Sequence, residues 1–212
     1  MNGVLFMIRI LLILIILTSC GNLPITYIQN FSSVNNVVFG FPDYKITQEI
    51  FDEYEFSFIK VRFGRGPHSI LVLAYINEDI FEWVGEDAVR IFTKNGRVIK
   101  TEGLEHNLEI LRPRNNIIED EESIQYESLN LYNPDLFLAV NESSATVRND
   151  QIRRLGSRIE VLKVIERNSV SSIGWKYKNL YYKNVDSDDI FKVEQHIHPR
   201  LPVLKVEYYY KF

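Results

Sequence analysis

One thiol carries the most definite chemistry in this sequence. The 212-residue chain has a single cysteine, Cys20, which ends the motif Leu17-Thr18-Ser19-Cys20. An apolar run over residues 10–17 leads into this motif, and two small residues stand directly before the cysteine. A short apolar helix followed by small residues is the anatomy of a cleavable secretory signal. A cysteine placed just after the cut can take a diacylglyceryl group, so the motif predicts a bacterial lipoprotein signal with Cys20 as the lipid attachment residue.

Two other interpretations of this stretch are an uncleaved membrane anchor and a buried helix. A membrane-spanning helix needs about 20 apolar residues, whereas the run over residues 4–17 is shorter and is interrupted by Arg9. Gly21 stands where inner-membrane retention signals of the enteric type carry Asp, which favours the periplasmic face of the outer membrane. We therefore expect a signal peptide at 1–19, a lipidated tether at 20–36 and a single β-barrel-like periplasmic domain at 37–212.

Carboxylates and imidazoles are the next residues that could do chemistry. Glu86 and Asp87 are adjacent, and a pair of carboxylates can hydrolyse glycosides, although a polar turn between two strands also explains them. His196 and His198 are two apart on an expected strand, so they would share a face as two metal ligands need. A third ligand is not evident near them, and an ordinary histidine pair at a strand end is the simpler interpretation.

Two acidic segments could hold a cation. Asp186, Asp188 and Asp189 resemble part of a calcium loop, but the glycine and the distal glutamate of such a loop are missing. Residues 119–122 form a run of four acids, which on a loop is usually a solvated face. The sequence therefore predicts no catalytic residue, no metal site and no cofactor.

Aromatic and basic residues could instead bind a ligand without reaction. Aromatic rings suit the flat apolar faces of sugars, and the candidates are Trp83, Trp175 and Tyr181, with Tyr177 and Tyr182 beside them. The same residues could simply form core. A basic cluster could face acidic polysaccharide or lipid headgroups, or could be a solvated face; its members are Arg153, Arg154, Arg148 and Arg158.

Composition favours a well-packed β domain. Hydrophobic residues make up 46% of the chain and aromatic residues 13%, with twelve Tyr and thirteen Phe, and aromatic residues are enriched in strands. The formal net charge is -4 and becomes -5 when Arg9 leaves with the signal. Since nucleic-acid binding favours a basic stripe, no nucleic-acid partner is expected.

The elements that would position these residues are mostly strands. Thr47 is typical of an N-cap and predicts one short helix at 48–54. Strands are expected at 56–63, 69–76, 80–84, 88–94, 97–101, 159–166, 174–183, 190–198 and 204–212. Asn95-Gly96 is the strongest hairpin signal, because both residues tolerate positive φ. The pattern predicts an all-β fold with minor α, either an antiparallel β-barrel or a closely packed two-sheet meander, with one short N-terminal helix.

The order of these features resembles the YjbF/GfcB family of outer-membrane lipoproteins, encoded with exopolysaccharide and group 4 capsule genes. The most specific block is 95–104, Asn-Gly-Arg-Val-Ile-Lys-Thr-Glu-Gly-Leu. Other matching features are Cys20, the segments 39–43, 54–62, 64–67, 72–75, 83–87, 179–181 and 199–202, and the residues Glu166, Trp175 and Gln195. The resemblance is weakest over 112–151. Family members end near a Leu-Lys-Pro, whereas this chain continues through Tyr208 to Phe212.

The resemblance implies an antiparallel β-barrel or closely packed pair of sheets and a role in producing or exporting surface polysaccharide. It supplies no catalytic residue. The leading hypothesis is a non-enzymatic lipoprotein that binds glycan or a secretion partner and is attached to the membrane through lipid on Cys20. The alternatives are a carbohydrate-active or lipid-handling enzyme, and a carrier of lipid or lipoprotein with an apolar cavity.

Overall fold

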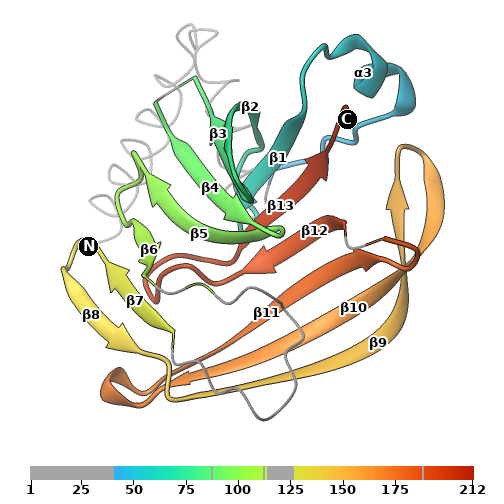
Figure 1. Ribbon diagram of the computed structural model, residues 1–212. Coiled ribbons are helices and arrows are strands. Elements are labelled where there is room, and N and C mark those ends of the chain that lie inside the picture. The colour runs from blue at the N-terminus through green and yellow to red at the C-terminus, as the bar shows by residue number, and fades with distance from the viewer. Residues whose placement is uncertain (1–40, 87, 112, 114–126, 188) are drawn as a thin grey trace, which may run out of the picture. The chain divides into compact units, whose positions relative to one another are not determined.

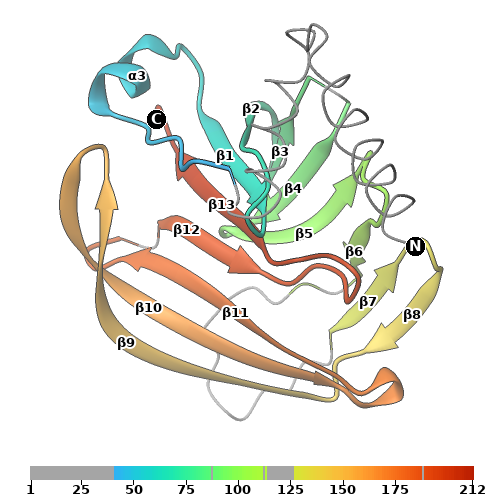
Figure 2. The same cartoon turned by 180° about the vertical axis from the view of Figure 1, so that it is seen from behind.

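Antiparallel strands account for most of the described chain (Figures 1 and 2). The computed structural model describes residues 41–86, 88–111, 113, 127–187 and 189–212. Within these residues the elements are α3 (Gln48–Glu53), β1 (Phe58–Phe63), β2 (Ser69–Asn77), β3 (Ile80–Val84), β4 (Arg90–Lys94), β5 (Arg97–Glu102), β6 (Leu108–Ile110), β7 (Ser128–Leu131), β8 (Leu136–Ala139), β9 (Glu142–Arg154), β10 (Ser157–Val170), the 3-10 turn η1 (Ser171–Ile173), β11 (Trp175–Asn184), β12 (Ile190–Gln195) and β13 (Leu204–Tyr209). The expected lipid attachment residue Cys20, the signal and the tether lie outside the described residues.

The strands form one continuous sheet in the order β8-β7-β6-β5-β4-β3-β2-β1-β13-β12-β11-β10-β9. Two meanders, β1 to β8 and β9 to β13, are joined where β1 pairs with β13, with Val61 opposite Val206. The edge strands β8 and β9 do not pair, so the sheet is not closed into a barrel. The all-β antiparallel prediction with one short N-terminal helix is confirmed, and the architecture is a single open sheet.

Local sequence explains the elements that the pattern predicted. Thr47 caps α3, its Oγ1 accepting a hydrogen bond from the Ile50 N–H at 3.4 Å. Asn95 and Gly96 have φ values of 47° and 73°, as the predicted two-residue turn between β4 and β5 requires. The strand expected at 204–212 is present as β13, and its sequence alternates apolar residues with charged ones. Leu204 and Val206 are fully buried on one face.

Each face of the sheet buries a cluster of its own. The inner face carries the main cluster, in which Ile59 of β1, Trp83 of β3 and Val206 of β13 are all 0% exposed. The outer face at β1 and β13 carries a smaller cluster of Phe58 and Tyr209 with Ile46, which α3 helps to cover (Figure 2). The sheet is therefore sealed on both sides along β1 and β13.

A buried lysine attaches the segment before α3 to the outer face. Lys60 of β1 is 4% exposed, and its ammonium donates to the Tyr44 carbonyl at 2.8 Å. The same ammonium lies 3.0 Å from the Glu207 carboxylate and 3.6 Å from that of Asp43. These contacts satisfy a charge that would otherwise be costly to bury.

A buried arginine connects the β4–β5 hairpin to distant strands across the inside of the sheet. Arg97 is 3% exposed and lies between Glu127 and Glu166, each 1% exposed. Its Nη1 donates to Glu127 at 2.6 Å, its Nη2 donates to Glu166, and its Nε donates to the Tyr181 hydroxyl at 3.2 Å. Three segments far apart in sequence thus meet at one guanidinium.

The electrostatics of this cluster keep Glu166 ionised. Burial by itself raises the pKa of a carboxyl, but the Arg97 guanidinium outweighs it. Side-chain amides add to this effect, with Asn179 Nδ2 at 2.7 Å and Asn168 Nδ2 at 3.0 Å from the carboxylate. The pKa of Glu166 therefore lies below its usual value.

Replacing Arg97 tests the importance of this contact. Arg97→Gln leaves two buried carboxylates without their shared cation, and we expect the free energy of unfolding to fall by about 3–5 kcal/mol. Chemical denaturation monitored by tryptophan fluorescence measures the change.

Arg90→Gln is the matched control, because Arg90 of β4 is half exposed and its ion pairs with Glu82 and Glu102 are longer, at 3.6 and 3.9 Å. We expect it to cost less than about 1 kcal/mol. Equal losses from the two variants would contradict the special role of the buried arginine.

Candidate functional site

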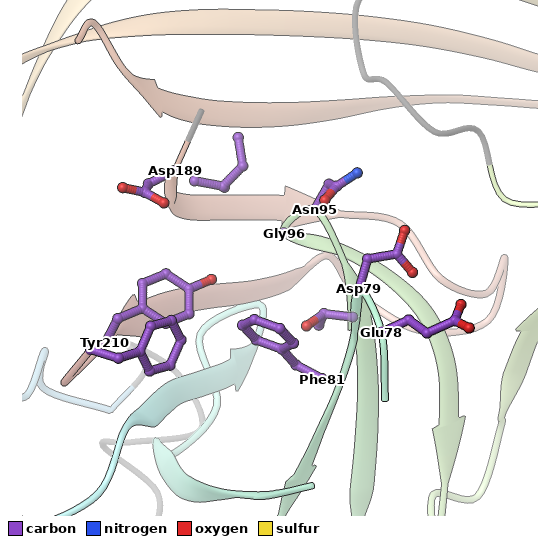
Figure 3. A pocket seen from close by; sticks show the side chains of 10 residues that line it. Glu78, Asp79, Phe81, Asn95, Gly96, Asp189 and Tyr210 are labelled. Atoms are coloured by element: carbon purple, nitrogen blue, oxygen red, sulfur yellow. The ribbon is translucent and has the colours of Figure 1, made fainter. Parts of the chain in front are cut away.

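A pocket opens at the end of the sheet where two hairpin turns meet the chain beyond β13 (Figure 3). Its volume is about 400 Å³. The lining residues are Glu78, Asp79, Phe81, Thr93, Asn95, Gly96, Asp189, Ile190, Tyr210 and Phe212. They come from the β2–β3 turn, β3, β4, the β4–β5 turn, the start of β12 and the residues after β13, so strands from both meanders form the pocket.

Strand register brings the two turns together. Ile80, at the start of β3, pairs with Lys94, at the end of β4, so the β2–β3 and β4–β5 turns lie at the same end of the sheet. The first turn is tight, with Glu78 at φ 56°. This placement follows from the two short hairpins.

One wall of the pocket is aromatic. Phe81 meets Tyr210 and Phe212 edge to face, with ring centroids 6.1 and 5.9 Å away and interplanar angles of 83° and 76°. Tyr210 and Phe212 lie 5.4 Å apart. Phe212 is 77% exposed, so a ring face is available to a ligand.

Carboxylates also line the pocket, with Asp189 on the side of Tyr210 and Glu78 and Asp79 across from it beside Phe81 (Figure 3). Asp79 lies 3.0 Å from the Lys94 ammonium, and Asp189 accepts a hydrogen bond from the Ser187 hydroxyl at 2.7 Å. Carboxylates accept hydrogen bonds at several lone-pair sites, so both can bind a further donor. Burial raises the pKa of Tyr210, which keeps its phenol protonated and able to donate.

The structure places the aromatic residues chosen from sequence mostly inside. Trp83 and Tyr181 are 0% exposed, with Trp83 Nε1 donating to the Thr93 hydroxyl at 2.9 Å. Neither ring has a face open to a ligand. Trp175 is half buried and stacks on Tyr177, with ring centroids 4.1 Å apart.

The two arginines chosen from sequence differ in their surroundings. Arg153 is exposed on β9. The Arg154 guanidinium lies over the rings of Phe191 and Tyr209, 4.5 and 4.9 Å from their centroids. Arg154 therefore packs as a cation–π partner at the β9–β10 hairpin.

Several acids considered from sequence fall outside the described residues, namely Asp87, Asp188 and the run 119–122. Glu86 is exposed in the turn before β4. Of the acidic loop before β12, Asp189 lies in the pocket. Reasoning from sequence missed Phe81, Tyr210 and Phe212 as site residues, although the alternation of aromatic residues at the C-terminal end was a usable signal.

The two histidines considered as metal ligands have separate partners. The His196 ring contacts the Lys178 carbonyl through Nδ1 at 3.0 Å. His198 is 1% exposed and stacks on His106, with ring centroids 4.6 Å apart and nearly parallel. No cluster of three or more metal-binding side chains occurs among the residues that the structure describes.

His198 makes stability depend on pH. Burial, with His106 and Arg200 nearby, lowers the pKa of His198 to about 4. Between about pH 4 and 6.5 the unfolded chain binds a proton at this residue that the folded protein does not. The free energy of unfolding should therefore fall as the pH drops from about 6.5 to 4.5, and His198→Gln should reduce the slope. Urea titrations at several pH values measure it, and equal slopes for the two proteins would refute the assignment.

The topology and the pocket together define an all-β domain. It is one open sheet with a pocket at the β2–β3 and β4–β5 turns. The chain belongs to the family described as group 4 capsule polysaccharide lipoprotein GfcB, YjbF, which matches residues 31–208. The resemblance stated from sequence is thereby confirmed. Among the described residues, no helix has the length and apolar character needed to cross a membrane.

A solved structure is similar in fold. The crystal structure of the hypothetical lipoprotein YmcC from Escherichia coli K12 has a TM-score of 0.69 and 16% sequence identity, covering 85% of this chain and 95% of YmcC. At that identity the likeness shows the fold alone. The comparison with curated proteins found no match.

Proposed function

We propose that this protein is a non-enzymatic lipoprotein that binds a glycan during the production or secretion of capsule polysaccharide, and that the pocket beside Phe212 is its binding site. The observation that carries the proposal is that aromatic rings, among them the exposed Phe212, and carboxylates line the same hollow. Membership in a capsule polysaccharide lipoprotein family supplies the polysaccharide context.

The chemistry of the pocket lining fits an uncharged sugar unit. Rings such as Phe81 and Phe212 suit the apolar face of a pyranose, while Asp79 and Asp189 can accept hydrogen bonds from its hydroxyls. The volume of about 400 Å³ lies within the usual range for small-ligand sites. Negatively charged sugars fit less well, because the carboxylates would repel them.

Truncating one exposed ring tests this assignment. Phe212→Ala removes stacking area without opening the core, and we expect binding of purified capsule polysaccharide to weaken about fivefold, equivalent to roughly 1 kcal/mol. Isothermal titration calorimetry on the full chain in detergent measures it.

Phe137→Ala is the matched control, because Phe137 of β8 is 68% exposed and does not line the pocket. It should leave affinity unchanged within about twofold, a difference of roughly 0.4 kcal/mol. Equal affinity for Phe212→Ala and the unaltered protein would place the site elsewhere. Release of new reducing ends from the polysaccharide would favour the enzymatic alternative, since acids line the pocket.

The proposal includes attachment to the periplasmic face of the outer membrane through lipid on Cys20, after removal of residues 1–19. Support comes from the motif at 17–20 and from the family description as a lipoprotein. Residues 20–36 would then act as the tether. The glycan-binding domain would remain within one tether length of the membrane surface.

Replacing the thiol tests the anchor. Cys20→Ser should abolish incorporation of an alkyne palmitate probe and release the protein from the outer-membrane fraction, because serine offers no thiol for the diacylglyceryl group. Ser19→Ala keeps a small residue before the cut and should remain labelled. Labelling that persists in Cys20→Ser would rule out this attachment residue.

A further inference from the structure

A second hollow lies on the long strands β9, β10 and β11, which form one end of the strand order in the sheet. It shares no lining residue with the Phe212 pocket. It is an open groove of about 710 Å³, formed by β9, β10 and β11 together with His196. Its charged lining side chains are Arg167, Lys176, Lys178 and Glu142. Three cations therefore stand against one carboxylate.

Strand register puts these cations on one face. Arg167 of β10 pairs directly with Lys178 of β11, and Ser169 pairs with Lys176, so the three cations share the face opposite to that of Glu166. Arg167, Lys176 and Lys178 are all exposed. None of the three has a salt bridge within the part of the chain that the structure describes.

Within the described part of the chain this arrangement of charges is unfavourable. Like charges directly opposite each other on neighbouring strands destabilise the pair, and Arg167 faces Lys178. The Arg167 Nη1 makes a long contact, 3.5 Å, with the Thr146 hydroxyl. On the same strands Lys163 does have an acid, since its ammonium lies 2.9 Å from Asp150. An anion bound between Arg167 and Lys178 would remove the repulsion.

We propose that this groove binds the acidic groups of a polysaccharide chain. Its cations supply charge, and the hydroxyls of Ser144, which lies opposite Arg167 on β9, and of Ser169 supply neutral hydrogen bonds of the kind that sugars exchange. A hollow of this volume accommodates a chain better than it accommodates the flat surface of a bilayer. The groove is separate from the pocket at Phe212, so the same polymer can present uncharged units to one and acidic units to the other.

One substitution separates ligand binding from folding. Lys178→Glu places opposite charges across the β10–β11 pair, so it should raise the melting temperature. It should also weaken binding of carboxylated oligogalacturonate about tenfold, a change of roughly 1.4 kcal/mol, with the loss shrinking at high salt. Fluorescence anisotropy with labelled oligogalacturonate, on the full chain in detergent, measures the affinity.

Arg148→Glu is the matched control. Arg148 of β9 is exposed, lies opposite Lys163 and does not line the groove, so the same charge change is made outside it. It should alter oligogalacturonate affinity less than twofold. Equal losses in the two variants would mean diffuse attraction to any basic surface and would overturn the proposal.

Competing polyanions decide the class of ligand. Single-stranded DNA of matched charge and vesicles of phosphatidylglycerol should compete at least tenfold more weakly than oligogalacturonate, and neutral dextran should not compete. Stronger competition by DNA or by vesicles would overturn the proposal in favour of that ligand. Since Phe212→Ala reports on the other site, failure here is distinguishable from failure of the proposed function.

Discussion

The buried guanidinium of Arg97 between Glu127 and Glu166 is the contact on which the rest of the structure depends. Burying three charged groups is costly unless they neutralise and hydrogen-bond one another, so β5, the residue before β7 and β10 must all meet at one point. The need to pair these charges also determines how the open sheet is held together. The two sheet edges do not pair, and the inside is held together by the β4–β5 hairpin reaching across it.

The same hairpin builds the candidate pocket. Next to Arg97, Gly96 packs so closely on Ile190 that an added Cβ would lie 2.4 Å from the Ile190 Cβ, and its φ of +73° also favours glycine. The Tyr208 hydroxyl donates to the Gly96 carbonyl at 2.8 Å, and Gln195 forms two hydrogen bonds with the Val98 backbone. The arginine cluster and these contacts position the turn rigidly, so the pocket wall at Asn95 and Gly96 is an extension of the core.

Structural features that depend only on neighbouring residues could be predicted from the sequence. The cap at Thr47, the turn at Asn95-Gly96 and the alternation over β13 each depend on neighbouring residues, and each is present. The pairing of β1 with β13 could not be predicted, because it joins residues at opposite ends of the domain. Side-chain type was a poor guide to exposure. Tyr181 is a candidate from sequence for stacking on a sugar, with core as the alternative, and the structure makes it core, its hydroxyl accepting a hydrogen bond from Arg97.

Strand alternation explains how one pair of strands can serve two purposes. In β10, Glu166 and Asn168 point to the inner cluster while Arg167 between them points outward, and in β11 Tyr181 lies inside while Lys178 faces out with Arg167. The inner face must neutralise its charges because water is excluded there. The outer face can tolerate two facing cations that have no salt bridge among the described residues, since solvent screens them. An excess of positive charge can therefore stay on the outer face and not on the inner one. The outer face is also the one that a ligand with acidic groups can reach.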